Sequence, residues 1–505
     1  MIKKSKSAPK FDFVLGDKAW IILIVAIFVL GLAIRLYDLT DAPLDFHPTR
    51  QLHSAMIARG MHYQHLDDIP DWQKERAINQ WRAEGLIEPQ IIETLTALVY
   101  RLIGNEQLWI ARLWSILFWM LAGIFMWLIL KRFVSMQASA VGLAYFLLWP
   151  YAAIASRAFQ PEALMILATS AGIWAATEWL EKRNFLWAAL AGFLCGLAIY
   201  IKSVAVFFVA PTLTGLILAN SSFHAAIKNR QAWVIFILSV LPYTLYHFYG
   251  VYVLGLLGQQ FSLRFFPAMW SDPVFYIRWT AEINKVVGLE ILLAALFGIL
   301  VFSRKKYMGL LIGLVAGYVL YGLTFAYHVT THDYYHLPLF IMISFGLGLL
   351  VEGLLNSVRK EKKRLAYIVL AGLLIFFSLQ KAWIVRSELK RTDYAEEVRI
   401  WQDLGDLLGY DKKVTGIMPD YGYRLAYWGW MSVSPWMQTA DIELRELAGN
   451  NIDYQNYLET AINNHDFFVI TDMEEFSRQK LLEDYLQNNF PVFSESDEWI
   501  IYQLR

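Results

Sequence analysis

Long apolar segments alternate with short polar connections along most of the chain. A helix needs about 20 predominantly apolar residues to cross the hydrocarbon of a bilayer. The sequence predicts eleven membrane-spanning helices, several of them short, near residues 19–36, 108–130, 137–155, 162–179, 185–201, 204–219, 232–254, 286–302, 308–327, 337–355 and 365–384. The first apolar run is long for a cleaved signal peptide, so we interpret it as an uncleaved first span.

Two of the polar connections are long. The first, residues 37–107, contains a polar, helix-prone middle and then an apolar helix at 91–103 that is too short to span. We expect that helix to lie along the outer leaflet or dip into it. The second, residues 255–285, alternates aromatic residues with arginines. This pattern suits an anionic headgroup or a sugar, and equally a plain interfacial anchor.

The pattern changes near Glu388. Apolar runs shorten to strand length, and two helical patterns appear between them. The predicted strands are 413–418, 467–470, 491–493 and 499–503, and the predicted helices are 395–408 and 476–488. The sequence therefore predicts a membrane domain over residues 1–387 and a water-soluble α/β domain over 388–505. Acceptor recognition and a structural lid are both consistent with the second domain.

Composition agrees with a polytopic α-helical membrane protein. The chain is 57% hydrophobic and 17% charged, with a mean hydropathy of +0.39, whereas a soluble domain is about a quarter charged. The formal net charge is zero, which gives no electrostatic reason to expect nucleic acid as a partner. The single cysteine, Cys195, lies inside an apolar run, so no intrachain disulfide forms.

Basic residues predict the orientation. Short cytoplasmic connections are enriched in Lys and Arg. If the N-terminus is cytoplasmic, the short inside connections hold fourteen basic residues, namely Lys131, Arg132, Lys182, Arg183, Lys228, Arg230, Arg304, Lys305, Lys306, Arg359, Lys360, Lys362, Lys363 and Arg364. The short outside connections hold two, Arg157 and Lys202. We therefore predict a cytoplasmic N-terminus and an extracytoplasmic C-terminal domain.

This orientation gathers the titratable groups in one compartment. Asp45, Glu162, Lys202 and the segment 328–336 all fall on the predicted external face, as do eight of the ten histidines when the tail is included. The densest group is the opening loop 45–53, which holds a carboxylate, two imidazoles and a guanidinium in nine positions. A scatter of solvated loop residues would not share one side. We interpret the external face as the site.

An enzyme on that face has no ready access to nucleotide-activated sugars, and the sequence has no nucleotide-binding motif. A sugar on a polyprenyl phosphate is within reach. Its transfer needs a base for the acceptor hydroxyl, cations for the departing phosphate and an apolar groove for the lipid. Asp45 is a candidate base. Candidate phosphate-binding cations are Arg157, Lys202, Arg264 and Arg278.

Several motifs then follow in a fixed order. They are Asp45 in the first external loop, Glu88-Pro89 before the short apolar helix, Ala111-Arg112 at the second long span, residues 156–162 ending in Glu162, the glycine-rich stretch 191–202 ending in Lys202, and residues 332–338. This layout resembles the GT-C superfamily of membrane glycosyltransferases, in the branch of protein O-mannosyltransferases and the lipid A aminoarabinose transferase. The resemblance covers most of residues 19–355.

The resemblance implies roles for individual residues. Asp45 would be the catalytic base, Lys202 would contact the donor phosphate, and Glu162 would assist or orient. Further substrate-binding candidates are His47, Arg50, Glu88, Arg157, Arg264, Arg278, His332, Asp333, Tyr334 and His336. The chain departs from the family in this loop. The order here is Asp45-Phe46-His47-Pro48, and Thr49 and Arg50 stand where many relatives have acidic residues after the proline.

Each assignment has a structural alternative. Asp45 could cap a helix that starts near Pro48, Glu162 could interact with the dipole of its own helix, and Lys202 could extend along the membrane to the interface. Histidines 328, 332 and 336 could hold a divalent metal together with Glu88 or His47. No cofactor is required by the sequence otherwise.

The sequence thus predicts a bacterial-type inner-membrane glycosyltransferase. It would transfer a hexosyl or pentosyl group from a polyprenyl-phosphate sugar to a glycan, lipid or protein acceptor, with inversion at the anomeric carbon. A transporter or flippase for a lipid-linked glycan is an alternative, although transporters place ionisable groups nearer mid-membrane. An inactive GT-C-like scaffold is another. The sugar, the acceptor and the oligomeric state stay open.

Overall fold

The structure is a computed structural model that describes residues 16–258, 263–450 and 452–505. The four N-terminal lysines that precede the first predicted span, Lys3, Lys4, Lys6 and Lys10, lie outside the described residues. Each of the eleven predicted spans is helical. The helices are α1 (Asp17–Leu36), α5 (Trp109–Phe133), α6 (Met136–Leu148), α8 (Glu162–Lys182), α9 (Phe185–Ile201), α10 (Val206–Asn220), α12 (Arg230–Tyr252), α14 (Leu289–Phe302), α15 (Lys305–Thr324), α17 (Leu339–Ser357) and α18 (Lys363–Leu389).

The number of full spans is smaller than predicted. Within the described chain, eight helical segments are long and apolar enough to cross a membrane, and α14 adds a ninth if it is counted with the helix before it. Helices α6 and α9 have 13 and 17 residues. Pro150 separates α6 from α7 (Pro150–Ala155), since the residue before a proline avoids the helical region and Trp149 is extended at ψ 131°.

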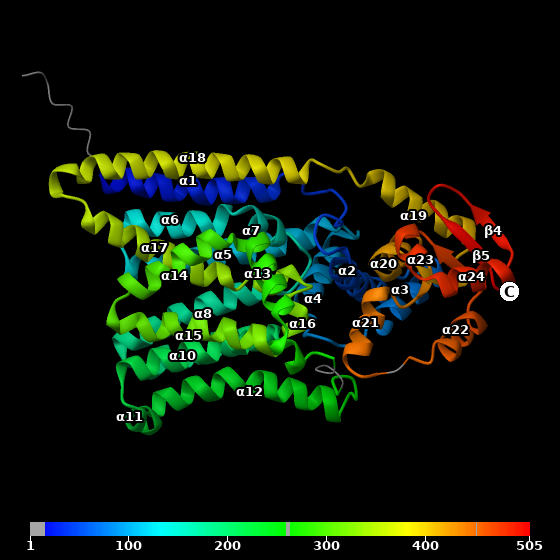
Figure 1. The fold of residues 1–505 in the computed structure, drawn as a ribbon, viewed down its shortest axis with the longest axis horizontal. Helices are drawn as coiled ribbons and strands as arrows, with labels where there is room; N and C mark the ends of the chain where they lie inside the picture. The colour runs from blue at the N-terminus through cyan, green and yellow to red at the C-terminus, as the bar shows by residue number, and fades with distance from the viewer. Residues whose placement is uncertain (1–15, 259–262, 451) are drawn as a thin grey trace, which may run out of the picture.

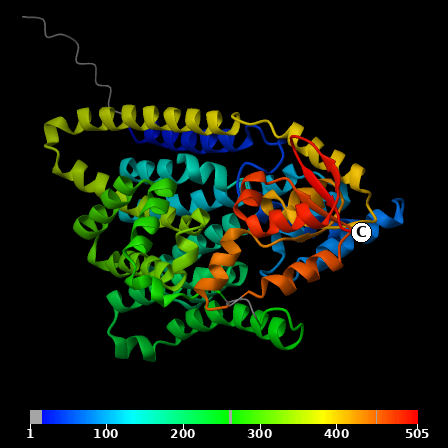
Figure 2. The same cartoon turned by 45° about the vertical axis from the view of Figure 1, so that its right-hand side comes forward.

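The long helices lie roughly parallel, and the C-terminal sheet lies beyond one end of them (Figures 1 and 2). Helices α1 and α18 run side by side along one edge and α12 along the other, while α8 is the most buried of the candidate spans. Large apolar side chains such as Ile22, Leu245 and Phe376 are exposed on the outer helices, as expected where a helix faces lipid. The protein is a multi-pass membrane protein.

Close helix packing relies on small residues. Helices α10 and α15 meet at Gly215 and Gly309, where an added Cβ on either would lie 2.0 Å from the other's carbonyl oxygen. Membrane helices commonly pack through such small residues because apolar contact with lipid is no worse than contact with protein.

Short elements cover the end of the bundle that faces the sheet. They are α2 (Pro48–Tyr63), α3 (Asp71–Ala83), α4 (Ile91–Ile103), η1 (Ser203–Ala205), η2 (Pro267–Ser271), α13 (Pro273–Val287), α16 (Ala326–Val329) and η3 (Asp333–His336). The predicted short helix is α4, which ends at Gly104 and leaves Leu102 exposed. Helix α13 meets α14 at an angle of 88°, and Gly288, at φ 78°, occupies the corner.

At the opposite end lie the turns that carry basic residues, including η4 (Lys360–Lys362) and α11 (Phe223–Lys228). The polar candidates of the first loop and of segment 328–336 lie together at the sheet end. The structure thus separates the basic turns from the candidate site along the bundle axis (Figure 1).

The C-terminal part is a mixed five-stranded sheet with helices, which confirms the predicted α/β class. Its elements are α19 (Ala395–Leu408), β1 (Lys413–Ile417), η5 (Pro419–Gly422), α20 (Tyr423–Trp428), β2 (Ser432–Pro435), α21 (Thr439–Leu447), α22 (Tyr454–Asn463), β3 (Phe467–Ile470), α23 (Met473–Arg478), α24 (Lys480–Asn489), β4 (Val492–Glu495) and β5 (Ile500–Gln503). The strand order is β2-β1-β3-β5-β4, with β1 parallel to β2 and β3, and β5 antiparallel to β3 and β4.

Two sequence expectations differ here. The predicted helix 476–488 is two helices, because Gln479 is non-helical at ψ 65° between α23 and α24. Strand β2 was not predicted, since Val433 is its only aliphatic residue and its four residues are half-buried or exposed. The predicted domain boundary at residues 387 and 388 falls in the last turn of α18, and the division into two domains stays a proposal.

The sheet end is joined to the membrane part by buried polar contacts. Arg59 on α2 donates to Glu106 Oε2 at 3.0 Å and to the Tyr427 carbonyl at 2.6 Å, and its guanidinium lies 3.6 Å from the centroid of the Tyr427 ring. Gln80 on α3 donates to the carbonyls of Ala426 and Met431 at 2.7 and 3.1 Å. These contacts connect α2 and α3 to α20.

We predict that Arg59→Met destabilises this junction. Glu106, whose side chain is 13% exposed, would lose its cation and keep only the Tyr427 hydroxyl, and breaking a buried ion pair typically costs up to about 3–5 kcal/mol of unfolding free energy. The thermal unfolding midpoint in detergent should fall, and limited proteolysis should release the C-terminal part earlier. Adding Glu106→Gln should recover part of the loss; an unchanged midpoint in Arg59→Met would show that the pair does not hold the junction.

Candidate active site

Four charged side chains meet where α8 begins and α9 ends. Lys202, which follows the last residue of α9, forms an ion pair with Glu162, the first residue of α8, and its Nζ lies 3.6 Å from Glu88 Oε1. The other oxygen of Glu88 accepts a 2.8 Å hydrogen bond from Arg50 Nη2 on α2. These residues form a chain of alternating charge, which we call the charge cluster.

Pairing keeps the charge cluster ionised despite its burial. Burial alone raises the pKa of Glu88, but the positive charges of Lys202 and Arg50 lower that pKa below its ordinary range. Burial alone lowers the pKa of Lys202, but Glu162 and Glu88 raise it above its usual value. Unpaired buried charges would cost several kcal/mol each. The alternative that Lys202 extends to the interface is therefore wrong, because its side chain is 10% exposed.

A second polar group stands beside the charge cluster. His47 Nε2 lies 2.5 Å from Asp333 Oδ1, and Lys285 Nζ lies 2.8 Å from Asp333 Oδ2. Burial raises the pKa of Asp333, but the hydrogen bond and charge of His47 and the hydrogen bond of Lys285 lower it well below its usual range. Loop residues 286 positions apart are thereby joined.

Tyr334 connects the two groups. Its ring centroid is 4.9 Å from that of His47 and 5.2 Å from Lys202 Nζ. The structure therefore brings together seven of the predicted site residues, His47, Arg50, Glu88, Glu162, Lys202, Asp333 and Tyr334.

Asp45 belongs to a different set of contacts. Its Oδ1 accepts a 3.0 Å hydrogen bond from Arg112 Nη2, and Arg112 also bonds to the Leu39 carbonyl at 3.2 Å. Arg157 donates to the Asp38 carbonyl at 2.7 Å. Two buried arginines thus fix the loop that precedes α2. Asp45 does not cap that helix, because the N-cap residue is His47 and makes no side-chain cap bond.

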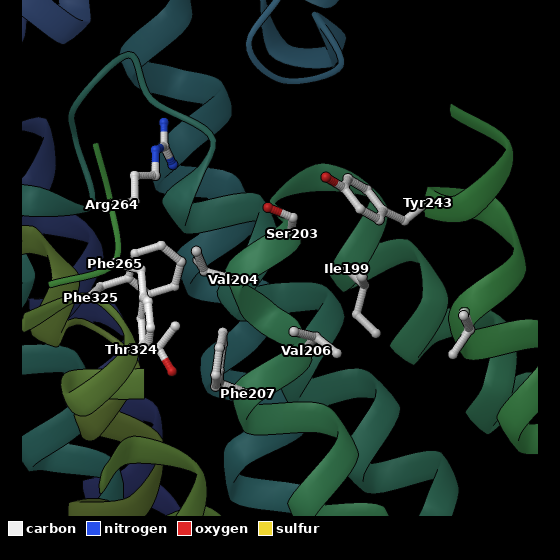
Figure 3. Close-up of a pocket in the computed structure, with 11 residues that line it drawn as sticks. Ile199, Ser203, Val204, Val206, Phe207, Tyr243, Arg264, Phe265, Thr324 and Phe325 are labelled. Atoms are coloured by element: carbon white, nitrogen blue, oxygen red, sulfur yellow. The ribbon is translucent and has the colours of Figure 1, made fainter. Parts of the chain in front are cut away.

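An apolar cavity of about 400 Å³ begins next to the charge cluster. Its walls come from α9, α10, α12 and the end of α15, and Ser203 and Val204, which directly follow Lys202, line it (Figure 3). Arg264 and Tyr243 are polar members of the lining. In Figure 3 the Arg264 side chain extends away from the apolar residues at one edge.

Other predicted residues lie outside these groups. Arg278 is exposed on α13. His336 is buried, with Nδ1 2.7 Å from the Tyr318 hydroxyl and Nε2 3.0 Å from the Val329 carbonyl. His332 contacts Thr331, and burial and nearby His47 lower its pKa to about 4.

The three histidines of segment 328–336 do not form a metal site. His328 stacks on Tyr335 at 5.6 Å, and His336 uses both ring nitrogens elsewhere. Among the residues that the structure describes, no group of three or more His, Cys, Asp or Glu side chains is arranged to hold a metal ion. The donor set therefore does not fit the divalent metal considered from the sequence.

Sequence reasoning missed residues that approach the site from distant elements. Lys285 was not a candidate because it is a lone lysine near the end of an amphipathic helix. Asp420 of the C-terminal part accepts a 2.9 Å hydrogen bond from the Thr49 hydroxyl, and it stands in a left-handed turn with φ 52°, 56° and 79° at Asp420, Tyr421 and Gly422. Such a turn is costly for residues other than glycine, but its conformation has no simple sequence signal.

The fold is shared with solved structures of two other proteins. ArnT from Cupriavidus metallidurans, solved bound to undecaprenyl phosphate, matches with a TM-score of 0.61 at 12% identity, over 97% of this chain and 98% of that one. The Archaeoglobus fulgidus oligosaccharyltransferase in its apo form matches with a TM-score of 0.55 at 10% identity, over 90% of this chain and 70% of that one. At these identities the likeness establishes the fold.

A family model described as dolichyl-phosphate-mannose-protein mannosyltransferase matches residues 88–249. That range begins at Glu88 and includes Glu162 and Lys202. No curated protein sequence matches the chain. The resemblance predicted from the motifs is confirmed at this level: the fold matches that of ArnT, and residues 88–249 match the mannosyltransferase family model.

The charge cluster predicts a specific acid response. Because the pKa of Glu88 is lower in the folded protein than in the unfolded chain, its stabilisation is present above the ordinary carboxylate range and is lost as pH falls through the folded value. We expect the wild-type unfolding midpoint to hold from pH 7 to about 5 and to fall below about 4.5, the ordinary Glu range. In Glu88→Gln the unfolding midpoint should fall less between pH 5 and lower pH than in the wild type. If the midpoints of the two proteins fell in parallel, Glu88 would not be the ionised group that stabilises the fold.

Proposed function

We propose that the protein transfers a sugar from a polyprenyl-phosphate-linked donor to an acceptor at the extracytoplasmic face of the membrane. The observation that carries this proposal is the position of Lys202. It stands between a cavity suited to a lipid chain and a cluster suited to a charged headgroup. A polyprenyl phosphate has this same division between an apolar chain and an anionic head.

The charges favour departure of a phosphate. As the sugar leaves, negative charge grows on the phosphate oxygen, and a preorganised cation in a partly dehydrated site stabilises that charge. Lys202 and Arg50 are the nearest cations of the charge cluster, and Arg264 at the cavity lining is a third. A phosphate entering beside Lys202 would compete with Glu88, whose contact is the longer one at 3.6 Å.

The catalytic carboxylates are proposed as Asp45 and Glu162, as the sequence predicts. Glu162 Oε2 is buried and has no hydrogen-bond partner among the described residues, so it is placed to accept from a sugar hydroxyl. The assignment of the base to Asp45 stays a prediction, because its Oδ1 is engaged by Arg112. Transfer rates of Asp45→Asn and of His47 variants would distinguish Asp45 from the neighbouring imidazole as the base.

The finer parts of the function are also proposals. The transferred group would be a hexose or pentose, inverted at its anomeric carbon, and the acceptor a glycan, lipid or protein. The domain over 388–505 would face the acceptor, since Asp420 reaches the first turn of α2. Grouping of the charges at one end of the bundle, away from its middle, favours a transferase over a transporter.

We predict that neutralising the Lys202–Glu162 pair weakens donor binding. Because Lys202 is buried, Lys202→Ala would leave the buried Glu162 without its cation, although Glu88 would keep Arg50, so the double variant Lys202→Gln/Glu162→Gln is the cleaner test. Its affinity for undecaprenyl phosphate should fall about 10- to 100-fold, the worth of a charge-assisted hydrogen bond. Lys381→Gln, on the outer helix α18, serves as the control. Equal affinities in the two variants would exclude Lys202 from the phosphate site.

The proposed orientation gives a separate prediction. A reporter that is active only outside the cytoplasm should give a signal when fused after Lys390 and none when fused after Lys360, because the basic connections are retained inside. The reverse pattern would place the charge cluster in the cytoplasm and remove the case for a lipid-borne donor.

A further inference from the structure

We propose that His47, held by Asp333, is the general base that deprotonates the acceptor hydroxyl, an inference that rests on the proposed function. The imidazole comes from the opening loop and the carboxylate from the connection before α17, so the pair exists only in the folded protein. A histidine oriented by a carboxylate is an effective base near neutral pH, because the carboxylate fixes the ring and stabilises the imidazolium that forms.

The hydrogen bond fixes the tautomer. An ionised carboxylate can only accept, so in the neutral imidazole His47 Nε2, 2.5 Å from Asp333 Oδ1, carries the proton and Nδ1 has the free lone pair. Nδ1 has no hydrogen-bond partner among the described residues. Lys285 at 2.8 Å holds the second oxygen of Asp333, so the carboxylate is fixed at both ends.

The backbone also points to a functional role. His47 lies in the left-handed region at φ 43° and ψ 66°, immediately before Pro48. That conformation is energetically unfavourable for a residue other than glycine. Such strained residues concentrate where a site requires a particular geometry. The side chain remains 30% exposed although its partner is buried. The ring is therefore fixed, yet open to a substrate.

Position relative to the donor supports the same role. His47 and Lys202 contact the same ring, that of Tyr334. A phosphate at Lys202 would place its attached sugar towards His47, on the side away from the apolar cavity. An acceptor entering from the C-terminal part would meet the imidazole beside Thr49, where Asp420 docks.

Other histidines of this end are unsuited to the role. Burial holds the pKa of His332 and of His336 at about 4. His53 gives Nδ1 to Glu84, whose carboxylate also accepts from the Tyr423 hydroxyl at 2.8 Å. His53 is thus part of the junction with the C-terminal part and supplies a matched histidine–carboxylate pair for comparison.

The proposed step moves one proton to His47 and one sugar to the acceptor. The acceptor O–H bond breaks and its proton moves to His47 Nδ1, while the acceptor oxygen forms a bond to the anomeric carbon. The bond from that carbon to the phosphate oxygen breaks, and its electron pair remains on the polyprenyl phosphate. The imidazolium, paired with Asp333, then returns its proton to water. No oxidant or further reactant is needed.

The test compares transfer rates of variants in membranes supplied with undecaprenyl-phosphate-linked hexoses and pentoses. His47→Gly suits the positive φ and removes the imidazole, and His47→Asn tolerates the same backbone but cannot take a proton at neutral pH. Both should lower kcat on the order of 100- to 10,000-fold, with undecaprenyl phosphate affinity unchanged. Added imidazole should restore part of the His47→Gly rate, which a structural role would not allow.

A pH profile supplies the second readout. Asp333 favours the imidazolium, so Asp333→Asn should lower kcat and move the acid limb of the profile to lower pH. The titratable and charged groups that face His47 are Asp333, His332 and Tyr334 of the segment before α17, Glu282 and Lys285 of α13, and Asp420 of the C-terminal part. Asp45→Asn should leave the acid limb in place, and His53→Asn should leave both rate and limb near wild type.

The outcomes are distinct. A nearly inactive Asp45→Asn beside active His47→Gly and His47→Asn would return the base to Asp45 and overturn the proposal. Loss in His47→Gly without imidazole rescue, and with weaker undecaprenyl phosphate binding, would also overturn it in favour of a structural role. A wild-type protein that transfers no polyprenyl-phosphate-linked sugar would instead defeat the proposed function, whatever the variants do.

Discussion

The site depends on the burial of Lys202 between Glu162 and Glu88. Two carboxylates this close would repel each other, and either alone would be costly to bury, so the lysine allows both to remain charged. The same contact fixes the architecture: it joins the start of α8, the end of α9 and the approach to α4. Arg50 extends the pairing to α2. Helix ends that could otherwise move independently are therefore held in one arrangement by charge balance.

In that arrangement Lys202 also stands where the surroundings change from charged side chains to an apolar cavity. Immediately after Lys202 the chain lines an apolar cavity, while Lys202 itself faces carboxylates. Charge interactions strengthen as water is excluded. A cation at such a boundary binds an anionic headgroup whose chain lies in the cavity more strongly than a lysine in water would. The paired carboxylates limit this attraction, which favours exchange of substrate and product over permanent occupation.

Sequence patterns predicted what depends on local periodicity or on membrane thermodynamics. The span positions, helix α4 and strands β1 and β3 follow from apolar runs, and the co-location of Asp45, Glu162 and Lys202 at one end follows from basic-residue counting. Pairing between distant residues was not predictable in this way. His47 meets Asp333 across 286 positions. Asp45, the candidate base whose structural alternative was a local helix cap, is bound by Arg112, which lies far along the chain. The residues of strand β2 show no apolar pattern. They form a strand because of their position beside β1 in the sheet.

The opening loop supplies only part of the charge around His47. The resemblance implies acidic residues after Pro48, and this chain has Thr49 and Arg50 there. An imidazole on this loop without a hydrogen-bond partner would not be held in one orientation or one tautomer. Asp333 supplies the missing carboxylate from the other side of the site, and Lys285 in turn holds Asp333. The groups around His47 therefore come from three elements: the opening loop, the segment before α17, and α13. A general base requires an oriented proton acceptor and not a particular position in the chain, so its orienting carboxylate can come from a distant element.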